Sequence, residues 1–460
     1  MTSPATTRES VSPLRPYRNR LIQGVAIISL TTVCASFAGL SFHLPQPVRH
    51  RSSVARGRIL SADGVVLAGN GESGRVYPGG RLSGPMLGFM GKDGGLEGLE
   101  ASQNGVLARG TDLHLTLDTR IETMAEGQLH SAIQAHQAQS GSVVVLDTAT
   151  GQVLALASAS SEDPTASAGS SPSNWRDRAA AGTFEPGSEM KALTVAAVID
   201  QGLATPGTVL DTPMHRKLPG ATIHDVVPHP AHLTTAGVLR YSSNVGISRL
   251  VERLGPQGLH DALKTFGIGQ GVRAFAVPAA TGRLNDWHRW GLLDAATNGF
   301  GQGITTTTLE FAAAFNTIAN DGMYVAPSLL AGQQGTPHRV IQVTTARTVQ
   351  HMLYRVVRDG IPQAARLPGY QLAGKTGTAQ VVVNGRYSPD VYVSTFSAFF
   401  PAGHPRFTVS IMVRGAKVKY QGSELAAPLV RDIASELASL ESLVPASPSS
   451  ALASPLPFAQ

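Results

Sequence analysis

The chain has 460 residues, enough for about two or three domains with sizeable hydrophobic cores. Charged residues make up 15% of the sequence and hydrophobic residues 42%, a balance typical of a globular, loop-rich protein and not of a disordered one. The formal net charge is +6, but no basic run with interleaved aromatic residues accompanies it, so nucleic acid is not an expected partner. The single cysteine, Cys34, excludes an intramolecular disulfide framework.

An apolar segment near the N-terminus predicts a membrane anchor. Residues 21–42 carry no charge and are long enough to cross a bilayer core as one helix, with arginines on both sides. We expect a cytoplasmic tail at residues 1–20, an uncleaved single-pass anchor at residues 21–43, and a catalytic part outside the cytoplasm. A cleaved signal peptide is the alternative, because residues 36–38 resemble a small-x-small cleavage site.

After the anchor the pattern changes from short strands to one large α/β domain. Residues 56–68 predict a strand, an Asp-Gly turn and a second strand. The later predicted elements are strands 113–117, 141–147, 152–158, 372–383, 391–400 and 407–413, helices 121–136 and 426–443, and a mostly helical stretch at 188–320. Residues 444–460 form a Pro/Ser/Ala tail with too little apolar content to fold.

Ser188 and Lys191 are the first candidate catalytic pair. Pro186 and Gly187 mark a turn, and the apolar run at residues 190–199 predicts a helix after it. Residues three apart lie on one helix face, so the serine and the lysine are expected to be neighbours. A buried, neutral lysine can remove the serine proton and so activate the hydroxyl as a nucleophile. Alone, a Ser-x-x-Lys is expected by chance about once in a chain of this composition.

Two later motifs make the pattern specific. Ser242 and Asn244 form a Ser-x-Asn, and Lys375, Thr376 and Gly377 form a Lys-Thr-Gly. Each is weak alone, since a Ser-x-Asn is usually a loop or a helix cap. All three in this order resemble the signature of penicillin-binding proteins and serine β-lactamases.

Further segments resemble the class B, division-type penicillin-binding proteins. Residues 56–59 (Arg-Gly-Arg-Ile), 75–80 and 95–100 are similar to three landmarks of that family's outer part. In most relatives a long head region separates the first two landmarks, whereas here residues 69–74 alone intervene. The resemblance therefore implies a truncated pedestal at residues 44–110, without the family's head.

The resemblance also implies the fold. We expect the penicillin-binding transpeptidase fold at residues 111–443, an α/β (α+β) domain in which helices flank an antiparallel sheet and an all-helical subdomain is added. A short β-rich pedestal and one transmembrane helix precede it. By resemblance, Ser188 is the nucleophile, Lys191 is the candidate base, Ser242 relays a proton to the leaving amine, and Asn244 holds a substrate amide.

The predicted strand at residues 372–383 supplies the substrate-binding side. By resemblance, the Thr378 N–H completes an oxyanion hole, and Lys375 with the hydroxyls of Thr376 and Thr378 receives the substrate carboxylate. Gly377 has no side chain, so a substrate backbone can approach the strand closely. Strand alternation is expected to place Lys375 and Gly377 on one face and the two threonines on the other.

Glu189 departs from the family pattern, because relatives commonly have Thr or Val after the nucleophile. One interpretation is that its carboxylate is stabilised by the dipole at the helix N-terminus. The other is that it points into the cleft, raises the Lys191 pKa and weakens the base.

Two other groups of residues have alternative interpretations. His215, His224, His229 and His232 lie close in the sequence, but no carboxylate or thiol completes a recognisable ligand spacing, so we expect no metal site and a loop beside the substrate cleft. The glycine-rich residues 299–303 are not followed by a Gly-Lys-Ser/Thr, which argues against a phosphate site.

The resemblance implies peptidoglycan D,D-transpeptidation in cell-wall and septal synthesis, without a cofactor. Stem peptides and β-lactams are the implied ligands, and a polytopic glycosyltransferase and division proteins are the implied partners. Three alternatives remain: a hydrolase (D,D-carboxypeptidase or β-lactamase), a penicillin-sensing receptor, and a division scaffold with decayed motifs. Against the hydrolase, no glutamate motif between Ser242 and Lys375 can be assigned to deacylation.

Overall fold

The computed structural model describes residues 55–161, 176–272, 275–383, 385–445 and 456–459. None of the helices in these ranges is long and apolar enough to cross a membrane. The predicted cytoplasmic tail and the predicted anchor at residues 21–43 lie outside the described residues.

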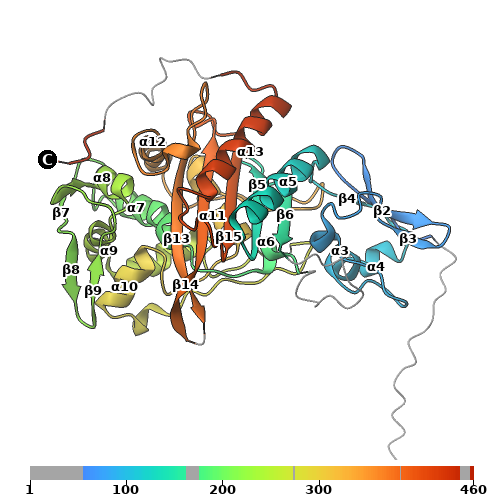
Figure 1. Ribbon diagram of the computed structural model, residues 1–460, viewed down its shortest axis with the longest axis horizontal. Helices are drawn as coiled ribbons and strands as arrows, with labels where there is room; N and C mark the ends of the chain where they lie inside the picture. The colour runs from blue at the N-terminus through green and yellow to red at the C-terminus, as the bar shows by residue number, and fades with distance from the viewer. Residues whose placement is uncertain (1–54, 162–175, 273–274, 384, 446–455, 460) are drawn as a thin grey trace, which may run out of the picture. The chain divides into compact units, whose positions relative to one another are not determined.

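A five-stranded antiparallel sheet lies at the centre of the catalytic domain, in the order β13-β14-β15-β5-β6 (Figure 1). The strands are β5 (Ser140–Asp147), β6 (Val153–Ser160), β13 (Ala373–Val383), β14 (Arg386–Phe400) and β15 (Phe407–Arg414). Each was predicted to within a few residues, apart from the longer β14. The early hairpin joins the late strands through β15 and β5, with Phe407 opposite Asp147 and Arg414 opposite Ser140.

Both faces of the sheet are covered, because successive residues of a strand point to opposite sides. Val143 and Val145 pack with α5 (Thr119–His136) and α13 (Ala426–Leu440), which lie in front of the sheet in Figure 1. Val144 and Leu146 pack on the other side with residues of α11 (Thr308–Ala319). Both β5 and β15 are accordingly buried along their whole length except for the last residue.

A second group of helices packs around α7 (Met190–Asp200), which follows the nucleophile turn. It contains α8 (Thr235–Tyr241), α9 (Asn244–Thr265), α10 (Leu292–Gly299) and α12 (Val343–Asp359). The expectation of an all-helical subdomain is wrong. β7 (Val209–Asp211) pairs with β10 (His232–Thr234), and β8 (His215–Leu218) pairs with β9 (Ala221–His224). The remaining short elements of the domain are α6 (Arg178–Ala181), η3 (Trp287–Arg289), β11 (Met323–Tyr324), β12 (His338–Arg339) and η4 (Gln363–Ala365).

A small sheet of order β3-β2-β1-β4 precedes the catalytic domain. Its strands are β1 (Ile59–Leu60), β2 (Val66–Gly71), β3 (Gly74–Val76) and β4 (Leu113–His114), with α2 (Gly84–Leu87), α3 (Gly98–Ser102) and α4 (Asn104–Leu107) beside them. Buried Glu100 binds Arg56 at 2.7 Å and Arg75 at 2.6 Å, so one ion-pair cluster joins the three landmark segments. The β2–β3 hairpin is tight, with Gly71 opposite Gly74.

The C-terminal residues 456–459 pack against α8, which differs from the expected unfolded tail. The Thr234 N–H donates to the Phe458 carbonyl at 3.1 Å, and Leu233 forms a β-bridge with Ala459. The centroid of the Phe458 ring lies 4.6 Å from the Arg240 guanidinium and 5.0 Å from that of Arg355. Cation–π contact and strand pairing thus hold a segment whose own composition is too poor to fold.

Candidate active site

Ser188 lies in the middle of a single 3-10 turn, η2 (Gly187–Glu189), which leads directly into α7. Gly187 has φ +57°, a conformation in which glycine is favoured. The Gly187 N–H donates to the Gly301 carbonyl at 3.0 Å, and a Cβ on Gly301 would lie 2.1 Å from the Gly187 oxygen. The glycine-rich loop at residues 299–303 therefore supports the nucleophile turn by close backbone contact.

Lys191 is completely buried one turn after Ser188, as the Ser-x-x-Lys spacing predicts. Its Nζ donates to the Ser242 carbonyl at 2.5 Å and to the Asn244 Oδ1 at 2.7 Å, and it lies 3.2 Å from the Ser242 Oγ. Burial, together with the positive charge of Lys375, lowers the Lys191 pKa well below its usual value. The amine is therefore suited to stay neutral and to accept a proton.

Ser242 and Asn244 lie in the sharp turn between α8 and α9. Ser242 ends α8 in the left-handed conformation, with φ 56° and ψ 40°, an unfavourable geometry for a residue with a Cβ. Ser243 then caps α9, since its Oγ accepts the Gly246 N–H at 2.8 Å. The Lys375 Nζ donates to the Ser242 Oγ at 3.0 Å, so Ser242 lies between the two lysines.

The Lys-Thr-Gly motif lies on β13, the edge strand of the central sheet. Lys375 is buried, and burial lowers its pKa to about 8. A Cβ on Gly377 would lie 2.4 Å from the Pro186 carbonyl, so the strand and the nucleophile turn are in direct contact there. The Thr378 Oγ1 accepts the Gly422 N–H at 2.9 Å.

Most of the predicted site residues line one cavity of about 480 Å³. It is lined by Ser188, Ser242, Asn244, Thr376, Gly377 and Thr378. Lys191 and Lys375 are not among its lining residues and act from behind through Ser242. Phe300 and Gln302, from the glycine-rich run at residues 299–303, also line the cavity. Further lining residues carry no motif and were missed in the sequence, namely Val226, Ile361, Tyr392 and Tyr420. Tyr392 and Tyr420 stack with ring centroids 4.3 Å apart. They are far apart in the sequence, so no local pattern predicts this contact.

Glu189 stands at the start of α7, as expected, but is buried there. It is 1% exposed, and its side chain makes no capping hydrogen bond to α7. It also does not line the cavity; a Cβ on Gly377 would lie 3.3 Å from its Cγ, which places the carboxyl beneath β13. Burial raises the Glu189 pKa to about 8, while the nearby Lys375 and the hydroxyls of Thr395 and Ser397 oppose that rise. Its charge acts on Lys375 and not on Lys191.

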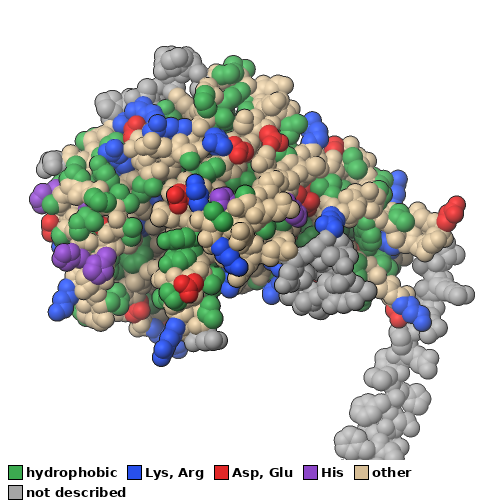
Figure 2. Space-filling view, in the orientation of Figure 1, with side chains coloured by type: hydrophobic (Ala, Val, Ile, Leu, Met, Phe, Trp, Pro, Cys, Tyr) green, Lys and Arg blue, Asp and Glu red, His purple; other side chains and the backbone are tan. Residues whose placement is uncertain are grey.

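The four histidines singled out in the sequence lie around β7–β10. Figure 2 shows histidine side chains at the surface of this end of the molecule. The His215 and His224 rings are 6.1 Å apart, whereas the His229 ring is buried against Asp225. Within the residues described, no group of three or more potential ligands could hold a metal ion.

Comparison with known proteins identifies the family. The family model described as "Penicillin binding protein transpeptidase domain" matches residues 141–435, which include all three motifs. The chain belongs to the penicillin-binding protein transpeptidase family. The resemblance to division-type class B members is likewise confirmed, since the similar proteins carry the names PenA, PbpB and FtsI.

Individual relatives are similar to this chain in sequence and in fold. It is 32% identical to "Probable peptidoglycan D,D-transpeptidase PenA" of Neisseria flavescens, over 77% of this chain and 88% of that protein. It is 36% identical to "Penicillin-binding protein PbpB" of Mycolicibacterium smegmatis, over 79% of this chain but only 64% of that protein. The crystal structure of penicillin-binding protein 3 of Mycobacterium tuberculosis with ampicillin superposes with a TM-score of 0.81 at 34% identity, covering 88% of this chain and 99% of that chain.

Proposed function

We propose that this chain is a serine-type peptidoglycan D,D-transpeptidase that cross-links stem peptides through an acyl-serine intermediate. The observation that carries the proposal is the arrangement of Ser188, Ser242 and Thr376 around one cavity, with the buried amine of Lys191 behind them. The names of the relatives support the same reaction.

In the acylation step, the Ser188 Oγ attacks the carbonyl carbon of the penultimate D-Ala. Lys191 accepts the hydroxyl proton, and two acceptors, the Ser242 carbonyl and the Asn244 Oδ1, orient its N–H groups. The N–H groups of Ser188 and Thr378 stabilise the oxyanion. The C–N bond then breaks, and the proton passes through Ser242 to the departing D-Ala amine.

In the second step, the amine of a neighbouring stem peptide attacks the acyl-Ser188 carbonyl carbon. The amine loses its proton to Lys191, the ester bond breaks, and the Ser188 hydroxyl is restored. Thr376 and Thr378 bind the substrate carboxylate at the cavity wall, with the positive charge of Lys375 behind them. Gly377 leaves space for the substrate backbone along β13.

We also propose the cellular setting expected from the sequence. Residues 21–43 anchor the chain in the cell membrane, residues 44–110 form a truncated pedestal, and residues 111–443 act outside the cytoplasm. A polytopic glycosyltransferase supplies the glycan strands, and division proteins position the enzyme during septal synthesis.

Labelling with a fluorescent penicillin tests the function. Wild-type protein should be labelled on Ser188, the label should persist for many minutes, and a cross-linked product should form only when an amine acceptor is supplied. Ser188→Ala should abolish labelling, whereas Ser423→Ala, a change in a serine of the same cavity wall, should preserve it. An adduct on another residue would contradict the assignment, and rapid release of hydrolysed penicillin would indicate a hydrolase.

A further inference from the structure

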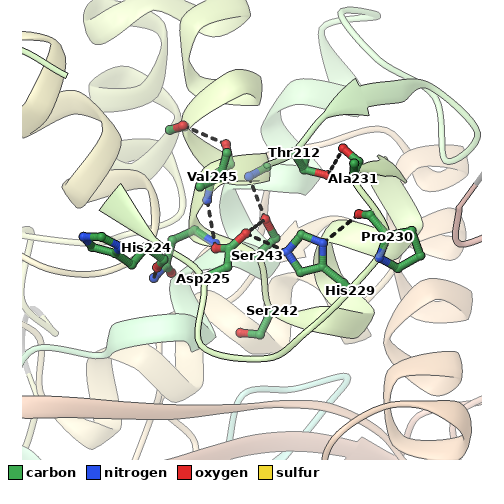
Figure 3. Close-up of polar contacts among 12 residues, drawn as sticks. Thr212, His224, Asp225, His229, Pro230, Ala231, Ser242, Ser243 and Val245 are labelled. Carbon is green, nitrogen blue, oxygen red and sulfur yellow. Dashed lines mark hydrogen bonds and ion pairs between the residues drawn. The ribbon is translucent and has the colours of Figure 1, made fainter. Parts of the chain in front are cut away.

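A buried acid, Asp225, and a buried histidine, His229, lie beside the turn that carries Ser242 and Ser243 (Figure 3). Asp225 directly follows β9, and His229 comes four residues later in the loop to β10. Their side chains are 1% and 0% exposed, and the His229 Nε2 lies 2.8 Å from the Asp225 Oδ2. Neither residue lines the cavity, so any effect on acyl transfer must pass through the turn.

Asp225 holds the turn by three hydrogen bonds. Its Oδ1 accepts the N–H of Asn244 at 2.5 Å and that of Val245 at 3.1 Å. Its Oδ2 accepts the Ser243 hydroxyl at 2.5 Å in addition to His229. Its two oxygens therefore accept from two backbone N–H groups and one hydroxyl, and the His229 ring lies against Oδ2. An anion is also favoured at this point, since the N–H groups belong to the N-terminus of α9.

His229 faces an acceptor with each of its ring nitrogens. The Nδ1 lies 2.8 Å from the Pro230 carbonyl oxygen, and the Nε2 lies 2.8 Å from the Asp225 carboxylate. A neutral imidazole has one N–H and would place a lone pair against one of these oxygens. Both contacts are satisfied together only when each ring nitrogen carries a proton.

Asp225 also affects the charge on Lys191. Its negative charge favours the protonated form of Lys191, against the effect of burial and of Lys375. Among the described neighbours, Tyr241 faces His229 with ring centroids 5.8 Å apart, and its hydroxyl accepts a hydrogen bond from Arg240.

We propose that Asp225 and His229 are a positioning pair for the transpeptidase reaction. Asp225 holds Ser242 and Asn244 against Lys191, and the imidazolium of His229 fixes Asp225 and cancels its charge near the base. This role rests on the proposed function, because Lys191 must be neutral when Ser188 attacks.

Two substitutions separate positioning from charge. His229→Phe removes both donors, whereas His229→Gln keeps a donor toward Asp225 and lacks the charge. The rate constant for acylation of Ser188 by penicillin is measured across pH on the full-length proteins. His232→Gln is the matched control, since His232 is exposed on the neighbouring β10.

We expect His229→Phe to slow acylation on the order of tenfold to a hundredfold, because the turn is misplaced. We expect His229→Gln to recover most of the plateau rate. In both variants the pH profile should move to higher pH, because the uncompensated Asp225 keeps the proton on Lys191 longer. His232→Gln should match wild type in rate and profile.

The protonation of His229 is read independently by ¹⁵N NMR of the histidine-labelled wild-type protein. Two protonated ring nitrogens at about neutral pH support the pair. One unprotonated nitrogen there, or wild-type rates and pH profiles in both variants, would overturn it. The spectrum needs neither a variant that folds nor an active enzyme. Absence of penicillin labelling in wild type would therefore refute the proposed function while the NMR result still decided the ion pair.

Discussion

Replacing Glu189 by glutamine should remove a pH-dependent loss of stability. The Glu189 carboxyl is buried, neither oxygen makes a hydrogen bond of good geometry, and its pKa is raised from 4.5 to about 8. Between these two values the folded chain holds a proton that the unfolded chain has released. The stability contributed by this proton is complete below the unfolded pKa and is lost as pH rises through the folded pKa.

The structure sets the size of the effect. One pH unit corresponds to about 1.4 kcal/mol for one proton. From the unfolded pKa of 4.5 to pH 7, the carboxyl therefore lowers the free energy of unfolding by at most about 3 kcal/mol. A glutamine amide does not titrate, so Glu189→Gln should unfold with a shallower dependence on pH by about 1.4 kcal/mol per unit. Burial of the glutamine amide changes the free energy of unfolding by an amount that does not depend on pH, so it leaves this slope unaffected.

The assay is urea unfolding of the full-length protein between about pH 5 and pH 8. Glu424→Gln is the matched control, because Glu424 is exposed, and it should leave the slope as in wild type. The negative charge of Glu189 also raises the Lys375 pKa. In Glu189→Gln, Lys375 should therefore lose its proton at a lower alkaline pH than in wild type, and penicillin acylation should be lost at that lower pH. Unfolding curves of wild type and Glu189→Gln that stay parallel across pH would refute the reasoning.

Three other predictions follow from packing and from the N-terminus. Gly301→Ala should lower the free energy of unfolding by about 1–3 kcal/mol and slow acylation, because φ is +85° and the new Cβ would lie 2.1 Å from the Gly187 oxygen. Thermal unfolding measures the first effect and penicillin labelling the second. Phe458→Ala should lower stability by about 1–2 kcal/mol in urea unfolding, since two guanidinium contacts are lost, and a fully stable variant would show that the C-terminal contact is unimportant. Mature protein from the membrane fraction should retain residues 21–42, and N-terminal sequencing that begins near Gly39 would mean a cleaved signal peptide instead.

Local chemistry made much of this protein predictable from the sequence. Strands with apolar runs and the helices at 121–136 and 426–443 appear close to their predicted bounds, because period and turn residues act over short distances. The three motifs were recognised because each keeps its reactive residues within a few positions. Their order along the chain then distinguished this family from a chance Ser-x-x-Lys.

Tertiary structure decided what depends on residues far apart in the chain. Burial beneath β13 gave Glu189 a role toward Lys375 that its place at a helix start did not suggest. His229 belonged to an apparent histidine cluster, yet folding places it on Asp225, behind Ser242. Packing also placed Phe458 against two arginines. A side chain's charge state and partners depend on which distant groups exclude water around it, and that is set only when the whole chain has folded.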